Sequence, residues 1–461
     1  MNLNPFELID FAIKRIGQIE NLLKYPHVGN ALLQLISPLM KSKETFWNKT
    51  FRYGVLTLGW GTSSPQEMTA FRSGFRAIRE ILERNRQAPI NKEPVVWVEW
   101  ITHGELLAAF DVPYFCTELL NIFGNTKGTE YPPNLIAEAE RHGIPPESCS
   151  SVKLSVGSYL LKQIPEPSII VAGSHPCDSS VGIYQTLEYL TKAPTFVFDM
   201  PYWKDDSGYA YYEDMTWELI YFLEKHLERK LDWNRLKQVL DQVDQVNTCL
   251  QEVCEMAQAK PCPNSMINLL FAWVAREIAI GSPHLINLAQ GIHDAVYQRY
   301  QKNEGVVKQE KIRILMWFPP IGFFTHIFRW MEETFGAVVV VDFIGHISTI
   351  PINTESKETM VRDLAKSHMH IAMGRQCHGP LKYITDELAM LMESYEPDCM
   401  IFTGHNGCKH GWASIKQIKS LCKRKNLPAL FLNLDIMDKR HTPEEELKKQ
   451  ITDFFIQNGW A

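Results

Sequence analysis

Short apolar runs alternate with segments of helical spacing along most of the chain. Runs of four or five mainly apolar residues, bounded by charge or turn residues, are typical of buried strands. Such runs occur at residues 95–98, 112–115, 168–172 and 195–198. Apolar residues recur every three or four positions, as in amphipathic helices, at 104–109, 133–142, 150–162 and 179–191. Strands that alternate with helices predict an α/β layer with a mainly parallel sheet.

A second unit of the same kind follows residue 305. Strands are predicted at 312–317, 338–343, 399–403 and 429–434, and helices at 322–335, 381–394, 414–425 and 444–457. We therefore predict an α/β fold with two Rossmann-like parallel-sheet domains, a pattern that suggests a diverged duplication. The predicted parts are an N-terminal helical region at 1–94, a first α/β domain at 95–205, a helical insert at 206–305 and a second α/β domain at 306–461.

Composition and charge exclude several classes of protein. The chain has 461 residues, 45% hydrophobic and 22% charged, which is the mix of an ordinary globular protein. A net charge of −6 without a basic stripe argues against a nucleic-acid partner. The sequence contains no stretch of about 18 apolar residues, so no membrane span is predicted. Glu7 stands where a signal peptide would carry basic residues, so we expect a cytoplasmic protein. There the ten cysteines would be free thiols or metal ligands.

Common catalytic and nucleotide motifs are absent from the sequence. The chain has no Gly-x-Gly-x-x-Gly after a strand and no P-loop, so we expect it to bind no nucleotide itself. It has no Gly-x-Ser-x-Gly elbow and no Cys-x-x-Cys pair, which argues against a serine hydrolase, a thioredoxin-like site or a zinc ribbon.

Three cysteines stand where α/β proteins build their sites. Cys177 and Cys408 each follow a predicted strand and precede a predicted helix, and Cys149 opens another helix. Ligands bind at the carboxyl ends of parallel strands, and a helix N-terminus stabilises a thiolate. The three thiols are far apart in sequence, so only the fold could assemble them. Together they could hold an iron–sulfur cubane by three irons and leave the fourth open as a Lewis acid.

Other roles for the cysteines stay open at this point. A free cysteine is usually a small buried hydrophobic residue, and three thiols with a water could instead hold Zn²⁺. Cys116 ends a predicted strand and Cys377 lies in a predicted turn, so both are reserve candidates for the same cleft. Cys262, which lies between two prolines, is assigned to a turn. The other four cysteines are assigned to the core: Cys249, Cys254, Cys399 and Cys422.

Several motifs resemble the 2-hydroxyacyl-CoA dehydratase family, which includes the cluster-binding subunits of ATP-dependent benzoyl-CoA reductase. The similar segments are His103-Gly104-Glu105-Leu106 with Val112-Pro113, Cys149-Ser150-Ser151, Cys177-Asp178-Ser179, Phe198-Asp199-Met200-Pro201, Asn406-Gly407-Cys408-Lys409 and Leu427-Pro428-Ala429. They follow the family order over about residues 90 to 461. Two positions depart from it, because His103 stands where the family often has proline and Asp111 where glycine is common.

The resemblance implies a function and a set of partners. A 4Fe–4S cluster with one open iron would be held by Cys149, Cys177 and Cys408. The chain would pair with a related subunit as a heterodimer, and an ATP-dependent iron–sulfur activator would supply one electron. The substrate would be a CoA thioester. In the favoured reaction, a ketyl radical forms and expels the 2-hydroxyl of a 2-hydroxyacyl-CoA to give the 2-enoyl-CoA.

Three alternatives remain beside that reaction. The first is an ATP-dependent benzoyl-CoA reductase subunit, in which the electrons stay in the ring. The second is a non-catalytic structural subunit. The third is a double-cubane reductase relative, which would need about three further thiols, of which Cys116 and Cys377 could supply two.

Polar residues near these cysteines receive provisional roles. Glu105 is the candidate catalytic residue, as a proton-transfer group or a CoA contact, although it could simply be a carboxylate at a helix start. The neighbouring histidines could hydrogen-bond cluster sulfur, Ser174 and Asn406 could donate to a thioester carbonyl, and Lys409 could meet a CoA phosphate. These histidines are His175, His405 and His410.

Overall fold

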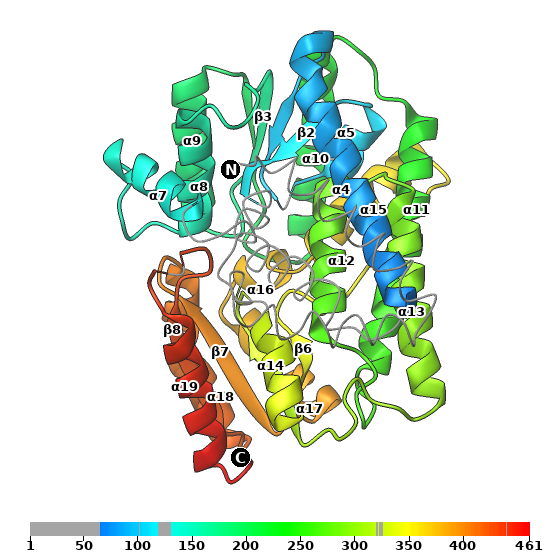
Figure 1. Cartoon of the computed structure of the whole chain (residues 1–461). Helices are drawn as coiled ribbons and strands as arrows, with labels where there is room; N and C mark the ends of the chain where they lie inside the picture. The colour runs from blue at the N-terminus through cyan, green and yellow to red at the C-terminus, as the bar shows by residue number, and fades with distance from the viewer. Residues whose placement is uncertain (1–64, 101, 119–130, 320, 322–325, 439) are drawn as a thin grey trace, which may run out of the picture.

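The computed structural model describes residues 65–100, 102–118, 131–319, 321, 326–438 and 440–461, and its two parallel sheets confirm the predicted α/β fold (Figure 1). The first sheet and helices α8 and α9 occupy the upper half of Figure 1, and the second sheet with α18 and α19 occupies the lower half. Long helices of the insert run beside both halves, together with α4.

The elements occur in the following order. The first part contains α4 (Pro65–Asn91), β1 (Val96–Val98), α5 (Gly104–Ala109), β2 (Tyr114–Cys116), α7 (Tyr131–Arg141), α8 (Ser150–Leu160), β3 (Ile169–Gly173), α9 (Asp178–Thr191) and β4 (Thr195–Phe198). The helical part contains α10 (Asp206–Leu227), α11 (Trp233–Met256), α12 (Met266–Ala279) and α13 (His284–Gln301). The last part contains β5 (Ile312–Trp317), α14 (His326–Phe335), β6 (Ala337–Asp342), α15 (Lys357–His368), α16 (Gly374–Cys377), α17 (Lys382–Tyr395), β7 (Cys399–His405), α18 (Lys409–Arg424), β8 (Ala429–Leu434) and α19 (Glu444–Gln457).

The two sheets have the same topology. The first has the strand order β2-β1-β3-β4 and the second the order β6-β5-β7-β8, and every pair is parallel. All residues of β5, β6 and β7 are buried, as expected where helices cover both faces of a parallel sheet. The repeated order agrees with a diverged duplication of the two α/β halves.

Most predicted elements are confirmed, and the differences have local causes. The helix expected at 414–425 begins earlier, at Lys409, because Cys408 caps it and accepts from the backbone N–H of Gly411. Helix α15 was missed; a capping box between Ser356 and Thr359 starts it. Most of the helical region predicted at 1–94, and residues 322–325 of another helix, lie outside the described residues. The proposed domain boundaries stay a prediction.

The helical insert packs against both α/β halves. Helix α10 contacts β4 of the first half and α15 of the second, while α4 packs along α12 and α13. A buried ion pair joins Arg299 of α13 to Glu67 of α4 at 2.5 Å. The insert therefore fixes the position of one sheet relative to the other. None of the described helices is long and apolar enough to cross a membrane.

Candidate functional site

The three predicted cysteines occupy equivalent positions in the fold. Cys149, Cys177 and Cys408 are the N-cap residues of α8, α9 and α18, so each directly precedes the first turn of a helix. A helix N-terminus carries partial positive charge and unpaired N–H groups, which stabilise anionic sulfur. One local arrangement thus recurs three times, twice in the first half and once in the second.

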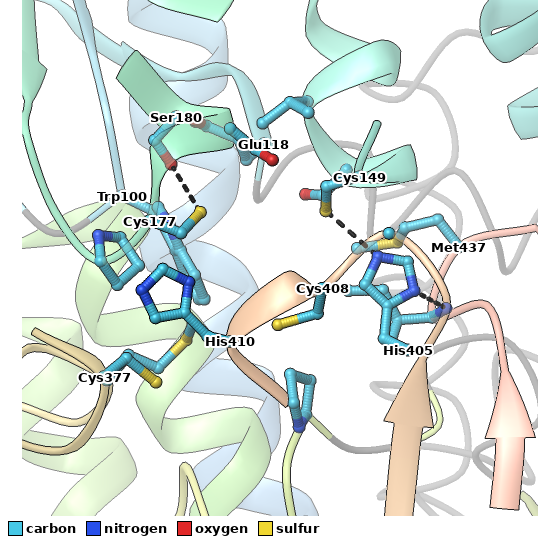
Figure 2. A pocket seen from close by; sticks show the side chains of 18 of the residues that line it. Trp100, Glu118, Cys149, Cys177, Ser180, Cys377, His405, Cys408, His410 and Met437 are labelled. Atoms are coloured by element: carbon cyan, nitrogen blue, oxygen red, sulfur yellow. Dashed lines mark hydrogen bonds between the residues drawn. The ribbon is translucent and has the colours of Figure 1, made fainter. Parts of the chain in front are cut away.

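One cavity of about 130 Å³ brings these cysteines together (Figure 2). Its lining comes largely from the segments that follow the strands of both sheets, so the carboxyl ends of the two sheets face one another across it. The exposed part of the lining is almost entirely apolar. The residues that follow strands are Trp100 after β1, Glu118 after β2, Cys177 after β3, Pro319 after β5, Ile344 after β6, Cys408 after β7 and Ile436 after β8.

The loops that carry Cys149 and Cys408 lie in direct contact. Gly407 is packed so closely that a Cβ atom placed on it would lie 2.5 Å from Cα of Cys149. Only glycine fits at this approach. At the edge of the cavity, the exposed Lys409 also pairs with Asp178 at 3.0 Å, so the starts of α18 and α9 are joined as well.

His405, at the end of β7, makes a directed hydrogen bond to Cys149. The backbone N–H of Ile436 donates to Nδ1 of His405 at 3.3 Å, which leaves Nδ1 as the acceptor of the ring. Nε2 then carries the proton and donates to Sγ of Cys149 at 3.2 Å. Burial lowers the pKa of His405, which favours the neutral ring over the charged one. Asp435 stabilises the adjoining loop by accepting from the backbone N–H groups of Met437 and Asp438, each at 2.8 Å.

The other two thiols also have local partners, and their ionisation is disfavoured. Sγ of Cys408 accepts from the N–H of Gly411 at 3.4 Å, and Sγ of Cys177 lies 3.7 Å from Oγ of Ser180. Burial raises the pKa of Cys408 to about 12 and also raises the pKa values of Cys149 and Cys177. Cys177 and Cys408 raise the pKa of Cys149 further, and Cys177 does the same to Cys408. Thiolates gathered here need a cationic group to compensate them.

The three thiols are ligands of the type that an iron–sulfur cluster requires. Within the described part of the chain, no three His, Cys, Asp or Glu side chains converge closely enough to hold one metal ion. The three thiols instead surround a cavity, and a cubane binds its thiolates at separate iron atoms. A cluster held by thiolates carries net negative charge, and the partial positive charge at the helix N-termini stabilises it.

The two reserve cysteines have different positions. Cys377 is the last residue of α16 and lines the cavity. Burial raises its pKa, and the nearby thiols of Cys408 and Cys177 raise it further. Cys116 ends β2, as predicted, but does not line the cavity; its Sγ lies 3.7 Å from Oε2 of Glu118. Cys254, Cys399 and Cys422 are buried, as expected for the core, whereas Cys249 is half-buried. Cys262 is buried beside a cis peptide bond.

Glu105, the predicted catalytic residue, lies away from this cavity. It is buried in the first turn of α5, where burial raises its pKa and Arg276 opposes that effect. The same arginine lies 3.3 Å from Glu277 and donates to Asn247 at 3.0 Å. The structure therefore places Glu105 in a buried charged group and not among the residues that line the cavity.

The remaining predicted residues divide between lining and support. His405, Lys409 and His410 line the cavity. His175 is fully buried and lies edge-on to His368, with ring centroids 5.8 Å apart. Ser174 accepts from the backbone N–H of Met200 at 3.0 Å, so its hydroxyl oxygen supports the strand end.

Asn406 turns toward His441 on the exposed side of its loop. The sequence analysis missed Glu118, a buried carboxyl group in the cavity wall. Its only signal in the sequence is an acidic residue three positions after the strand predicted at 112–115.

Comparisons with known proteins identify the family of this chain. The family model described as 2-hydroxyglutaryl-CoA dehydratase, D-component, matches residues 99–455. A benzoyl-CoA reductase subunit from Thauera aromatica is 22% identical over 350 residues, which cover 70% of this chain and 79% of that protein. The family match covers β2, β3 and β4 of the first sheet, all of the second sheet, the insert and all three N-cap cysteines. The chain therefore belongs to the 2-hydroxyglutaryl-CoA dehydratase D-component family.

Proposed function

We propose that this chain is the iron–sulfur subunit of an enzyme that dehydrates a 2-hydroxyacyl-CoA to the 2-enoyl-CoA. Cys149, Cys177 and Cys408 would hold a 4Fe–4S cluster with one open iron. The observation that carries this proposal is the meeting of three N-cap thiols at one apolar cavity between the carboxyl ends of two sheets. When bound, such a cluster supplies one low-potential electron and a Lewis-acidic iron.

The chain's own residues would prepare the cavity for that chemistry. The N-termini of α8, α9 and α18 stabilise negative charge on the thiolates. His405 donates to Sγ of Cys149 and so stabilises added electron density at that sulfur. The apolar lining, which includes Trp100 and Trp273, excludes water and strengthens every charge interaction inside.

Reduction of an aromatic CoA ester is the second candidate function. The similarity to the benzoyl-CoA reductase subunit favours it, while the family model favours dehydration. Both reactions begin with one-electron activation of a CoA thioester and would need the same cluster. They differ in whether the electrons are recovered or remain in the product.

We further propose that the chain works with other proteins. A related subunit would complete a heterodimer, and a separate ATP-dependent iron–sulfur activator would deliver the electron, since the sequence carries no P-loop. All ten cysteines are free thiols, which suits a reducing, cytoplasmic and oxygen-poor setting.

The test starts from anaerobically purified protein, co-expressed with the product of a neighbouring related gene. Iron and acid-labile sulfide would be quantified and EPR spectra recorded after dithionite reduction. We expect about four irons and four sulfides per chain, and loss of the signal in Cys149→Ser, Cys177→Ser and Cys408→Ser. Cys249→Ser, which changes a half-buried cysteine on α11 away from the cavity, is the matched control.

Turnover then separates the two functions. The assembled complex with its activator would be given 2-hydroxyglutaryl-CoA and benzoyl-CoA in separate reactions. Formation of an enoyl-CoA without net consumption of electrons supports dehydration, and a dearomatised product formed with stoichiometric reductant supports ring reduction. Zinc in place of iron, or no metal under strict exclusion of oxygen, would contradict the cluster and both reactions.

A further inference from the structure

Glu118 is a buried carboxyl group in the wall of the cysteine cavity. It follows β2, is 3% exposed, and is one of the labelled side chains around the cavity in Figure 2. Asp178 is the other carboxylate in the described lining, but it is mostly exposed and paired with Lys409. Glu118 is therefore the acidic group that a substrate in the cavity would meet out of contact with bulk water.

The two carboxyl oxygens of Glu118 have different surroundings. Oε2 lies 2.9 Å from the hydroxyl of Tyr184, 3.3 Å from Oγ1 of Thr117 and 3.7 Å from Sγ of Cys116. Oε1 is buried and has no hydrogen-bond partner within the described residues. A buried carboxyl oxygen without a partner loses a strong interaction with water, so it is a natural acceptor for a polar group of a bound molecule.

Tyr184 lets Glu118 exist in either protonation state. The Tyr184 hydroxyl lies 2.8 Å from the carbonyl oxygen of Val98 and 2.9 Å from Oε2 of Glu118. When Glu118 is ionised, the tyrosine O–H donates to the carboxylate. When Glu118 is protonated, the tyrosine can donate to Val98 and accept from the carboxylic acid. Oε2 therefore keeps a hydrogen bond to the tyrosine in both states, while Oε1 has no partner among the described residues.

The ionisation of Glu118 also suits proton exchange near neutral pH. Burial raises its pKa to about 7, although hydrogen bonds from its own backbone N–H and from Tyr184, Thr117 and Cys116 act to lower it. Among the described residues, the titratable groups in contact with it are Cys116 on β2 and Tyr184 on α9, and burial raises the pKa of Tyr184 well above its usual value. A general acid or base is most effective when its pKa lies near the working pH.

From this geometry, we propose that Glu118 exchanges a proton with the acyl group of the substrate. This inference rests on the proposed function. In the dehydration, the one-electron-reduced thioester first expels the 2-hydroxyl as hydroxide, which leaves with the C–O pair. The carboxylate then takes the proton from the β-carbon, which hydroxide loss has made acidic, and the C–H electron pair becomes part of the new C=C bond. Glu118 passes this proton to the hydroxide, which departs as water. Glu118 ends as the carboxylate with which it began, and the added electron is returned.

The test compares isosteric amide variants in the cluster-loaded complex. Glu118→Gln keeps the shape of the side chain but cannot carry the proton, so turnover should fall about 10²- to 10⁴-fold. Its iron content and EPR spectrum should match those of the unchanged protein. Glu332→Gln is the matched control, because Glu332 is also buried with a pKa raised to about 7 but lies on α14 outside the cavity lining. It should retain turnover.

Isotope exchange gives a readout that a merely structural role would not change. In D₂O, the reverse reaction of the enoyl-CoA should place deuterium at the β-carbon, and Glu118→Gln should slow this exchange as much as turnover. Tyr184→Phe removes the hydroxyl that serves both protonation states, so it should shift the pH profile while the cluster is retained.

The outcomes separate this inference from the proposed function. If the loaded complex turns over neither 2-hydroxyglutaryl-CoA nor benzoyl-CoA, the proposed function is wrong, and this inference is wrong with it. If the unchanged complex is active and Glu118→Gln exchanges and turns over at the same rate, only the role of Glu118 is contradicted. If Glu118→Gln binds no iron, while Glu118→Asp binds iron and retains full activity, the carboxylate is structural and the proposal is also overturned.

Discussion

Replacing Gly407 by alanine should separate the two loops that present Cys149 and Cys408. The added Cβ would lie 2.5 Å from Cα of Cys149 and 2.8 Å from its backbone nitrogen. Carbon atoms in ordinary contact are about 3.5–4.0 Å apart, so the loops must move apart by about 1 Å. Both obstructing atoms belong to the backbone, and no side-chain rotation can relieve the contact.

The expected cost follows from this displacement. Overpacking of a buried site typically destabilises a protein by about 1–3 kcal/mol. A functional constellation tolerates only about 0.5 Å of error, so the loss of bound iron should exceed what the loss of stability alone would cause. We would measure iron per chain after anaerobic reconstitution, together with urea unfolding of the same preparation.

Gly182→Ala is the matched control for this substitution. Gly182 lies in α9, is exposed, and a Cβ added to it would meet no described atom within 4 Å. Alanine in a helix interior is favoured over glycine by about 0.5–1 kcal/mol, so this variant should be slightly stabilised and load iron normally. Full iron loading and undiminished stability in Gly407→Ala would refute the close approach of the two loops.

Three further predictions concern the sulfur environment and the buried charges. His405→Phe removes the donor to Cys149 and should make the midpoint potential of the bound cluster more negative in an EPR-monitored redox titration; an unchanged potential would contradict the role of this hydrogen bond. Burial raises the pKa of Glu332 from 4.5 to about 7, so the folded protein keeps a proton that the unfolded chain loses, and the free energy of unfolding should fall as pH rises from 4.5 to 7. Urea unfolding at pH 5 and pH 8 should show a smaller fall in Glu332→Gln, and an equal fall in both proteins would argue against the shift. Arg313→Met leaves the buried Glu310 without its partner at 2.6 Å and should cost about 3–5 kcal/mol in urea unfolding, whereas Lys425→Met breaks an exposed pair and should change little.

The fold was largely predictable because its elements have strong local signals. The apolar runs of the strands and the spacing of α9 and α19 depend only on neighbouring residues, and the structure reproduces them. The positions of Cys149, Cys177 and Cys408 at helix starts were equally local. Their shared cavity was an expectation from resemblance, since no sequence pattern states which loops face each other across two sheets.

The polar half of the site could not be predicted because its partners are distant in sequence. Tyr184 meets Glu118 from 66 positions away, and Ile436 fixes the tautomer of His405 from 31 positions away. A motif drew attention to Glu105, which the fold places beside Arg276, while Glu118 belongs to no motif. Contacts of this kind depend on how whole helices and strands pack together, and residue spacing and composition do not predict that packing.

The sulfur positions at the two sheets have a mechanical consequence. Cys177 and Cys408 are 231 positions apart (177 to 408) and belong to different halves, yet they line one cavity. A rigid group bound to both would act as a covalent cross-link that closes a loop containing the whole helical insert. By the relation used for disulfide loops, closing a ring of this size removes about 5 kcal/mol of chain entropy from the unfolded state. Destruction of the group by oxygen would then do more than stop turnover. It would remove the cross-link, weaken the association of the two α/β halves and make the chain more susceptible to proteolysis.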